Sequence, residues 1–102
     1  MTSGPFRSTL GGRALGPPFF FMQIQILFFA SYRDLVGTGE MALRVPRGIT
    51  VSGLVEEIRA MGGGFSELPA IPVVAVNQEY ALEERILEDG DVVALIPPVA
   101  GG

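Results

Sequence analysis

The stretch Gln23–Phe29, QIQILFF, carries the clearest structural signal in this chain of 102 residues. Its side chains alternate between polar or mixed and apolar positions, as in a β-strand that is buried on one side. One face of this strand consists of Ile24, Ile26 and Phe28. The opposite face begins polar at Gln25 but turns apolar at Leu27 and Phe29. We therefore expect a strand with one face in the core and an apolar end on the other face.

Working outward, Glu40–Val45 predicts a second strand that pairs with the first as a hairpin, stopped by Pro46-Arg47-Gly48. Residues 31–39, SYRDLVGTG, predict the connecting turn, with room for one helical turn. Further along, Thr50 is a good N-cap for an amphipathic helix of about three turns. The apolar positions of that helix are Val51, Leu54, Val55, Ile58 and Met61.

Gly62-Gly63-Gly64 predicts the end of this helix and the start of a mobile loop that runs to about Pro72. Val73–Val76 and Val92–Ile96 predict two apolar strands, and residues 80–87 a short edge strand between them. The element order is then β-β-α-β-(β)-β. It indicates an α+β domain, in which a mixed sheet of four or five strands packs on one main helix.

Three segments divide the chain. Residues 1–21 are rich in Gly, Pro, Ser and Thr without periodicity, so we expect a disordered or irregular extension. Their Arg residues and lack of acids are also typical of a transit peptide, but we favour a natural start at Met22 because a clean strand follows at once. Residues 22–96 form the domain, and residues 97–102 form a tail. No stretch is long and apolar enough to span a bilayer, and we expect a cytoplasmic protein.

Composition removes most catalytic chemistry. The chain has no Cys, no His and no Lys, so it lacks thiolate, imidazole and amine groups. We therefore do not expect an enzyme that works alone, nor a bound cofactor or metal. The acidic turn Glu88-Asp89-Gly90-Asp91 lacks the ligand spacing of a calcium loop and predicts a solvated turn.

Charge points to a protein partner. Residues 22–102 carry five Arg against eleven acidic residues, a net charge of −6, which argues against nucleic acid as a partner. An acidic body suits a protein with a basic surface, although mild acidity also serves solubility alone.

The chain ends in Pro97-Pro98-Val99-Ala100-Gly101-Gly102. Proline favours an extended entry, and glycine, without a Cβ, admits the backbone to narrow spaces. Six extended residues reach about 20 Å, which would carry the terminal carboxylate into the pocket of another protein. The competing interpretation is a frayed terminus without function.

Together these residues resemble the family of small, sulfur-carrying subunits of molybdopterin synthase, within the ubiquitin-like β-grasp superfamily. The resemblance covers residues 22–102 in order. The matching segments are Ile26–Ala30 with Arg33, Val36-Gly37, Ala75–Gln78, Leu87 with Asp89–Val92, and the ending Pro97–Gly102. The thiamine-pathway sulfur carriers share the fold and the Gly-Gly ending but are shorter and lack the Pro-Pro pair.

The resemblance implies a non-catalytic sulfur carrier in a sulfurtransferase complex. An ATP-dependent, E1-like enzyme would adenylate Gly102 and, with a sulfur donor, convert it to a thiocarboxylate. The tail would then enter the large synthase subunit, in a heterotetramer, and give its sulfur to cyclic pyranopterin monophosphate for a molybdenum or tungsten cofactor. The alternatives are a ubiquitin-like modifier that joins Gly102 to lysines and a carrier for thiamine or amino-acid synthesis.

A partner surface is expected on the strand face that the helix leaves open. Leu27 and Phe29 lie on this face by alternation, as do Val92, Ala94 and Ile96. The resemblance adds Arg33 to Phe29 and Ile96 as positions near the large subunit, and Ile96 replaces what is often an aromatic residue. The competing interpretation is that loops or residues 1–21 cover these side chains.

Overall fold

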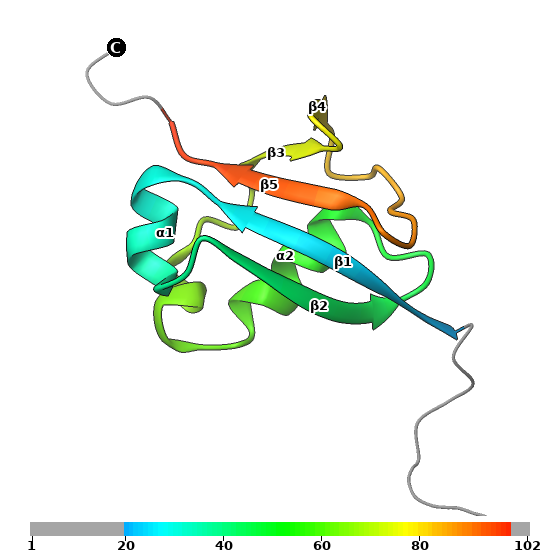
Figure 1. Ribbon diagram of the computed structural model, residues 1–102, viewed down its shortest axis with the longest axis horizontal. Helices are drawn as coiled ribbons and strands as arrows, with labels where there is room; N and C mark the ends of the chain where they lie inside the picture. Colours follow the sequence, from blue (N-terminus) through cyan, green and yellow to red (C-terminus); the bar gives the residue numbers. More distant parts are fainter. Residues whose placement is uncertain (1–19, 99–102) are drawn as a thin grey trace, which may run out of the picture.

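The computed structural model describes residues 20–98 (Figure 1). Five strands and two α-helices make up the fold, with one short 3₁₀ helix, η3. In chain order the elements are β1 (Phe21–Phe28), α1 (Ala30–Val36), β2 (Glu40–Pro46), α2 (Val51–Arg59), η3 (Gly63–Glu67), β3 (Val73–Val76), β4 (Glu79–Ala81) and β5 (Val92–Ile96). The predicted α+β class is confirmed, but the predicted element order lacked α1, which lies between the first two strands.

The strands form one mixed sheet in the order β2-β1-β5-β3-β4. β1 pairs antiparallel with β2 and parallel with β5, with Phe28 opposite Leu95. β3 pairs antiparallel with both β5 and β4. The first and last strands of the domain are therefore central neighbours that run in the same direction.

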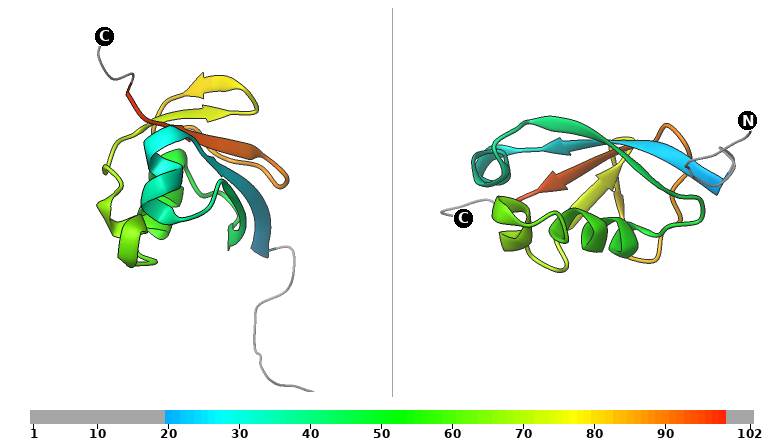
Figure 2. Two further views of the ribbon diagram at one scale, coloured as in Figure 1. Left: turned by 60° about the vertical axis from the view of Figure 1, so that its left-hand side comes forward. Right: turned by 90° about the horizontal axis from the view of Figure 1, so that it is seen from below.

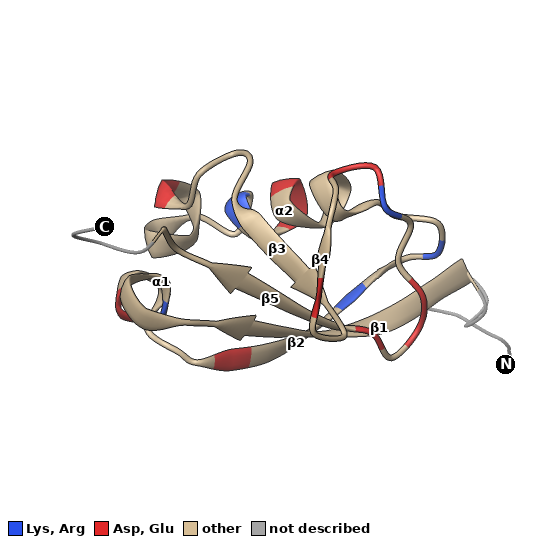
Figure 3. Cartoon of the chain, turned by 90° about the horizontal axis from the view of Figure 1, so that it is seen from above, with Lys and Arg blue, Asp and Glu red and all other residues tan. Residues whose placement is uncertain are grey.

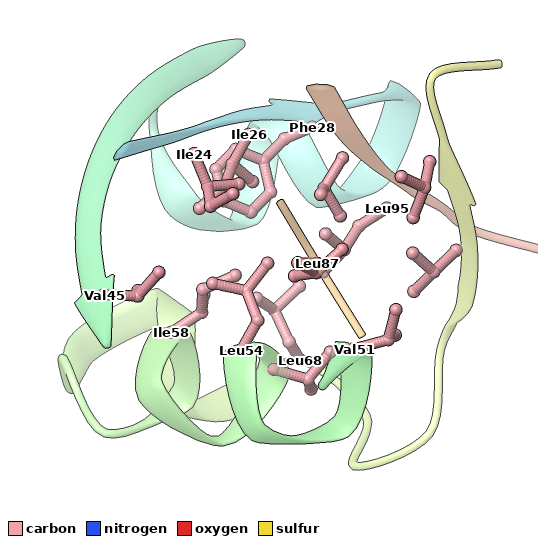
Figure 4. Close-up of a cluster of buried hydrophobic side chains, with 14 of the residues drawn as sticks. Ile24, Ile26, Phe28, Val45, Val51, Leu54, Ile58, Leu68, Leu87 and Leu95 are labelled. Carbon is pink, nitrogen blue, oxygen red and sulfur yellow. The ribbon is translucent and has the colours of Figure 1, made fainter. Parts of the chain in front are cut away.

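Helix α2 covers one face of this sheet and leaves the other face open (Figure 2). Thr50 caps the helix as predicted, because its Oγ1 accepts a hydrogen bond from the backbone N–H of Gly53 at 3.1 Å. Four of the five predicted apolar positions, Val51, Leu54, Val55 and Ile58, are buried against the sheet (Figure 4). Met61 is 48% exposed, because the helix ends at Arg59 and the chain turns away.

Three predicted boundaries were wrong. β1 starts at Phe21 rather than Gln23, so the expected domain start at Met22 falls inside the strand. The segment after β1 forms a full helix of about two turns, α1, which begins at Ala30 in a left-handed conformation (φ 47°). β4 ends at Ala81, and the following residues form a turn and a single bridge between Thr50 and Ile86.

The glycine-rich segment after α2 is also more ordered than the predicted loop. It contains η3, and its Phe65 ring meets the ring of Phe28 edge-on at a centroid distance of 6.0 Å. Gly64 lies so close to the Leu35 carbonyl that a side chain at Gly64 would collide with it. Leu68, just after η3, is buried in the core. Within residues 20–98, no helix is long and apolar enough to cross a membrane.

Candidate functional site

A shallow apolar groove lies on the open face of the sheet, with a volume of about 580 Å³. It is formed by side chains of β1, β3, β4 and β5 and of the β3–β4 turn. These are Leu27, Phe29, Ala75, Asn77, Gln78, Tyr80, Val92, Ala94 and Ile96. We call this surface the open-face groove.

Alternation along the two central strands produces the groove. Ile26 and Phe28 of β1 are 0% and 2% exposed, on the face that α2 covers. Leu27 lies between them and points the other way, half-buried, and the next residue, Phe29, is 47% exposed. β5 repeats the pattern with Leu95 buried and Ile96 half-buried. The described residues thus leave an apolar face as predicted, and the described loops do not cover it. The competing interpretation, that the N-terminal extension covers it, lies outside the described residues for residues 1–19.

The groove reaches the root of the predicted tail. Because β1 and β5 run parallel with Phe28 opposite Leu95, Phe29 and Ile96 come at the same end of the sheet. Ile96 is also opposite Val73, where β3 begins. Pro97 and Pro98 follow Ile96 directly, whereas Val99, Ala100, Gly101 and Gly102 lie outside the described residues. A chain that leaves β5 therefore starts beside exposed apolar side chains.

Arg33 does not line this groove. It is exposed on α1, and its side chain lies near Gly39, where a Cβ would come within 3.2 Å of Arg33 Cδ. α1 begins immediately after Phe29, so Arg33 borders the same end of the sheet from outside the groove. Its predicted contact with a partner stays a prediction.

Four groove residues escaped the sequence analysis as surface residues, namely Ala75, Asn77, Gln78 and Tyr80. Tyr80 is 79% exposed and forms the wall of the groove on β4, and Asn77 closes the end away from the tail. The signal for Asn77 was available, since Asn favours the left-handed conformation that it and Gln78 adopt (φ 51° and 73°) in the two-residue β3–β4 turn. Nothing in the local sequence marked Tyr80.

Asn77 and Asp91 form a polar clip beneath that end of the groove. Asn77 Nδ2 donates to Asp91 Oδ1 at 2.9 Å, and Asn77 Oδ1 accepts from the Val92 N–H at 2.9 Å. Asp91 Oδ2 accepts from the Glu88 N–H at 2.8 Å, and Asp89 Oδ1 accepts from the Gln23 N–H at 2.8 Å. The acidic turn therefore uses two of its carboxylates to hold the backbone together.

The described residues offer an apolar surface suited to binding. No group of three acidic side chains among residues 20–98 is placed to hold a metal ion. Burial raises the pKa of Tyr32, but this side chain belongs to the core rather than to the groove. The strands at the centre of the sheet carry no charged residue, and most acids lie on helices and loops around it (Figure 3).

Comparison with known proteins identifies the family of this chain. Residues 26–102 match the model of the ThiS family. The chain belongs to this family. A sulfur carrier subunit of molybdopterin synthase from Chlamydomonas reinhardtii is 36% identical over 83 residues, which cover 79% of this chain and all of the relative.

Two solved structures place the fold. A Pyrococcus furiosus protein provisionally assigned as subunit 1 of a molybdopterin converting factor superposes with a TM-score of 0.66 at 32% identity. The match covers 76% of this chain and 99% of that protein. A ubiquitin from Caldiarchaeum subterraneum, at 22% identity and a TM-score of 0.56, shares the fold over 80% of this chain and 99% of its own. The fold is a ubiquitin-like β-grasp, as expected.

Proposed function

We propose that this chain is the sulfur-carrier subunit of a molybdopterin synthase. The observation that carries the proposal is the similarity to relatives named sulfur carrier subunits of molybdopterin synthase, at 36% identity over 83 residues for the Chlamydomonas reinhardtii protein. The family match from Ile26 to Gly102 extends the similarity to the glycine ending. The open-face groove supports it, because an apolar surface beside the tail root can dock the domain while the tail enters the partner.

The proposed chemistry uses only the terminal carboxylate of Gly102. A carboxylate oxygen attacks the α-phosphorus of ATP on an E1-like enzyme, which forms the acyl adenylate and releases pyrophosphate. A sulfur donor then supplies a nucleophile at the oxidation level of hydrosulfide. This sulfur attacks the carbonyl carbon of the adenylate and expels AMP, which leaves the thiocarboxylate. Without Cys, the chain has no side-chain thiol that could compete as the carrier of this sulfur.

The acceptor in this proposal is cyclic pyranopterin monophosphate, held by the large subunit. The tail from Pro97 to Gly101 threads into that subunit and delivers the sulfur for a molybdenum or tungsten cofactor. The carrier itself holds no cofactor and catalyses no step. We propose a heterotetramer of two large and two small subunits, formed in the cytoplasm, where ATP is available to the activating enzyme.

Docking in this proposal relies on the exposed apolar side chains at the tail end of the groove. Leu27, Phe29 and Ile96 supply the contact, and Arg33 stands beside them on α1. Burial of aromatic and branched side chains at the centre of an interface gives most of its affinity. The acidic residues around the sheet suit a partner with a basic rim.

The decisive experiment measures intact mass after incubation with the activating enzyme, ATP and a sulfur donor. The natural chain should gain the mass difference between sulfur and oxygen, localised to Gly102. Deletion of Gly102 should abolish the transfer to the large subunit, because one residue moves the reacting carbon by more than about 3 Å. Misplacement by about 1 Å can already cost about 10²-fold in rate.

The controls separate chemistry from docking. The Gly102 deletion should bind the large subunit nearly as well as the natural chain. Gly101→Val should behave like the deletion, because a branched side chain would obstruct entry of the tail into a narrow channel of the large subunit. An isopeptide adduct without any thiocarboxylate would indicate that the chain is a protein modifier instead. Full sulfur transfer by the deletion variant would overturn both.

A further inference from the structure

β2 forms one outer edge of the sheet, next to β1 (Figure 1). With seven residues it is much longer than β4, the three-residue strand at the other edge. A long edge strand presents unpaired backbone groups that can bind another strand.

Hydrogen bonding to β1 fixes which backbone groups face outward. The Phe28 N–H donates to the Gly39 carbonyl, and the Arg47 N–H donates to the Phe20 carbonyl, both at 2.9 Å. In an antiparallel pair, hydrogen-bonded and non-hydrogen-bonded pairs alternate. The backbone groups of Met41, Leu43 and Val45 therefore point to β1. Those of the alternate residues, from Glu40 to Pro46, point away from the sheet.

The two ends of this edge are partly closed. Thr38 Oγ1 donates to the Glu40 carbonyl at 2.9 Å and accepts from the Glu40 N–H at a long 3.4 Å. Pro46 has no N–H to offer. Among residues 20–98, no hydrogen bond covers the outward backbone groups in the middle of the edge, at Ala42 and Arg44.

The side chains along this edge are self-complementary. Register with β1 puts Glu40, Ala42 and Arg44 on the open face of the sheet, and all three are exposed. A two-fold axis at Ala42 would place Glu40 opposite Arg44 of a second copy, twice by symmetry. On the other face, half-buried Met41 would meet Leu43 of the second copy. Opposite charges and apolar pairs directly across strands are stabilising.

We propose that the edge of β2 is a homodimerisation site, at which two copies pair antiparallel about Ala42 and join their sheets into one. Ala42 exchanges both of its outward backbone hydrogen bonds with Ala42 of the second copy. Glu40 and Arg44 fix the register, because a shift by two residues would separate the opposite charges.

This dimer leaves the sulfur-carrier surface free. In the strand order, β1 separates β2 from β5, and on that side the groove reaches no further than Leu27 of β1 and Phe29 just after it. Because the two copies run antiparallel, their β5 strands end at opposite ends of the joined sheet. The dimer goes beyond the proposed function and does not depend on it.

The test is sedimentation equilibrium of the full chain over a range of concentrations. The natural chain should show a concentration-dependent dimer. Glu40→Arg alone and Arg44→Glu alone should each weaken it about tenfold or more, because each creates two like-charged contacts. The double variant Glu40→Arg/Arg44→Glu should restore the affinity, although it loses the stacking of Arg44 over Phe21, 5.1 Å away. Circular dichroism should show that all three variants are folded.

Matched controls decide between this edge and other contacts. Glu57→Arg and Arg85→Glu make the same charge changes at exposed positions elsewhere and should leave the dimer unchanged. Phe29→Asp should also leave it unchanged, which excludes association through the open-face groove. Ala42→Pro should abolish it, because this change removes an outward N–H without touching the ladder to β1. A chain that is monomeric at every concentration, or a dimer insensitive to both single charge reversals, would overturn the proposal.

Discussion

The two faces of the sheet are built from the same strands and the same kinds of residues, yet they have opposite roles. On the face beneath α2, Ile26 and Leu95 are fully buried. On the open face, their chain neighbours Leu27 and Ile96 are only half-buried, and Phe29 is nearly half exposed. A shift of one residue thus decides whether an apolar side chain stabilises the domain or remains available to a partner. The difference teaches that residue type alone does not separate core from interface in this fold.

The largest difference in stability should appear between two variants that place an aspartate on the buried face and on the open face of β1. Ile26→Asp buries a carboxylate without a partner, and we expect a loss of about 4–5 kcal/mol or more, which approaches the whole stability of a domain at the low end of the usual range. Leu27→Asp changes the very next residue but lets the carboxylate reach water, so the variant should remain folded. Thermal unfolding of both variants by circular dichroism checks the contrast. A Leu27→Asp variant that unfolds as readily as Ile26→Asp would show that the groove belongs to the core.

A second effect should appear only in binding. Phe29→Asp should keep the domain folded but weaken assembly with the large subunit by about 30-fold or more, the loss typical of a central aromatic contact. Met61→Asp is the matched control, because Met61 is equally exposed at 48% but lies after α2, outside the groove. Isothermal titration with the large subunit measures both. Equal losses in the two variants would mean that net charge, and not the groove, sets the affinity.

How much of this contrast the sequence revealed depends on the residue. Alternation from Ile24 to Phe29 predicted both faces of β1, since strand periodicity is a local property. The cap at Thr50 predicted the start of α2, and the Gly62–Gly64 run predicted that the helix ends before it. No local signal showed that the helix would already end at Arg59 and leave Met61 exposed. The open face was predicted from the sequence. The position of Tyr80 at its wall was not, because this position depends on the pairing between β3 and β4.

Helix α1 and the 3₁₀ helix η3 were not predicted in full, and the structure shows why. α1 begins at Ala30 with a positive φ and without a side-chain cap, so it lacks the usual start signal. The Gly62–Gly64 run is typical of a loop, yet Gly64 is needed because the Leu35 carbonyl leaves no room for a Cβ. In both places tertiary contacts between distant segments override local preference. The tail was predicted from sequence, and its residues from Val99 to Gly102 lie outside the described residues.

A third, smaller effect concerns the polar clip between the faces. Asn77→Ala removes two side-chain hydrogen bonds and leaves Asp91, which is 9% exposed, with one fewer donor. We expect a loss of about 1–3 kcal/mol in chemical denaturation. Asn77→Gly loses the same bonds but tolerates the φ of 51°, so it separates hydrogen bonding from backbone conformation. Gln78→Gly, which removes no such bond, should be neutral or slightly stabilising; a loss as large as that of Asn77→Ala would contradict the clip.

The smallest effect is a pH dependence that distinguishes the two tyrosines of the chain, one on each side of the sheet. Tyr32 is 8% exposed in the core, and desolvation raises the pKa of its phenol, whereas Tyr80 is 79% exposed beside the groove. A raised pKa means that, above about pH 10, the folded chain holds a proton that the unfolded chain has lost. The free energy of unfolding should therefore fall as the pH rises through this range.

The chain has no Cys or Lys side chain that would titrate in the same pH range. The fall should persist in Tyr80→Phe and disappear in Tyr32→Phe, and urea unfolding of both variants from neutral to alkaline pH measures it. A fall that persisted in Tyr32→Phe would contradict the burial of Tyr32 in the core.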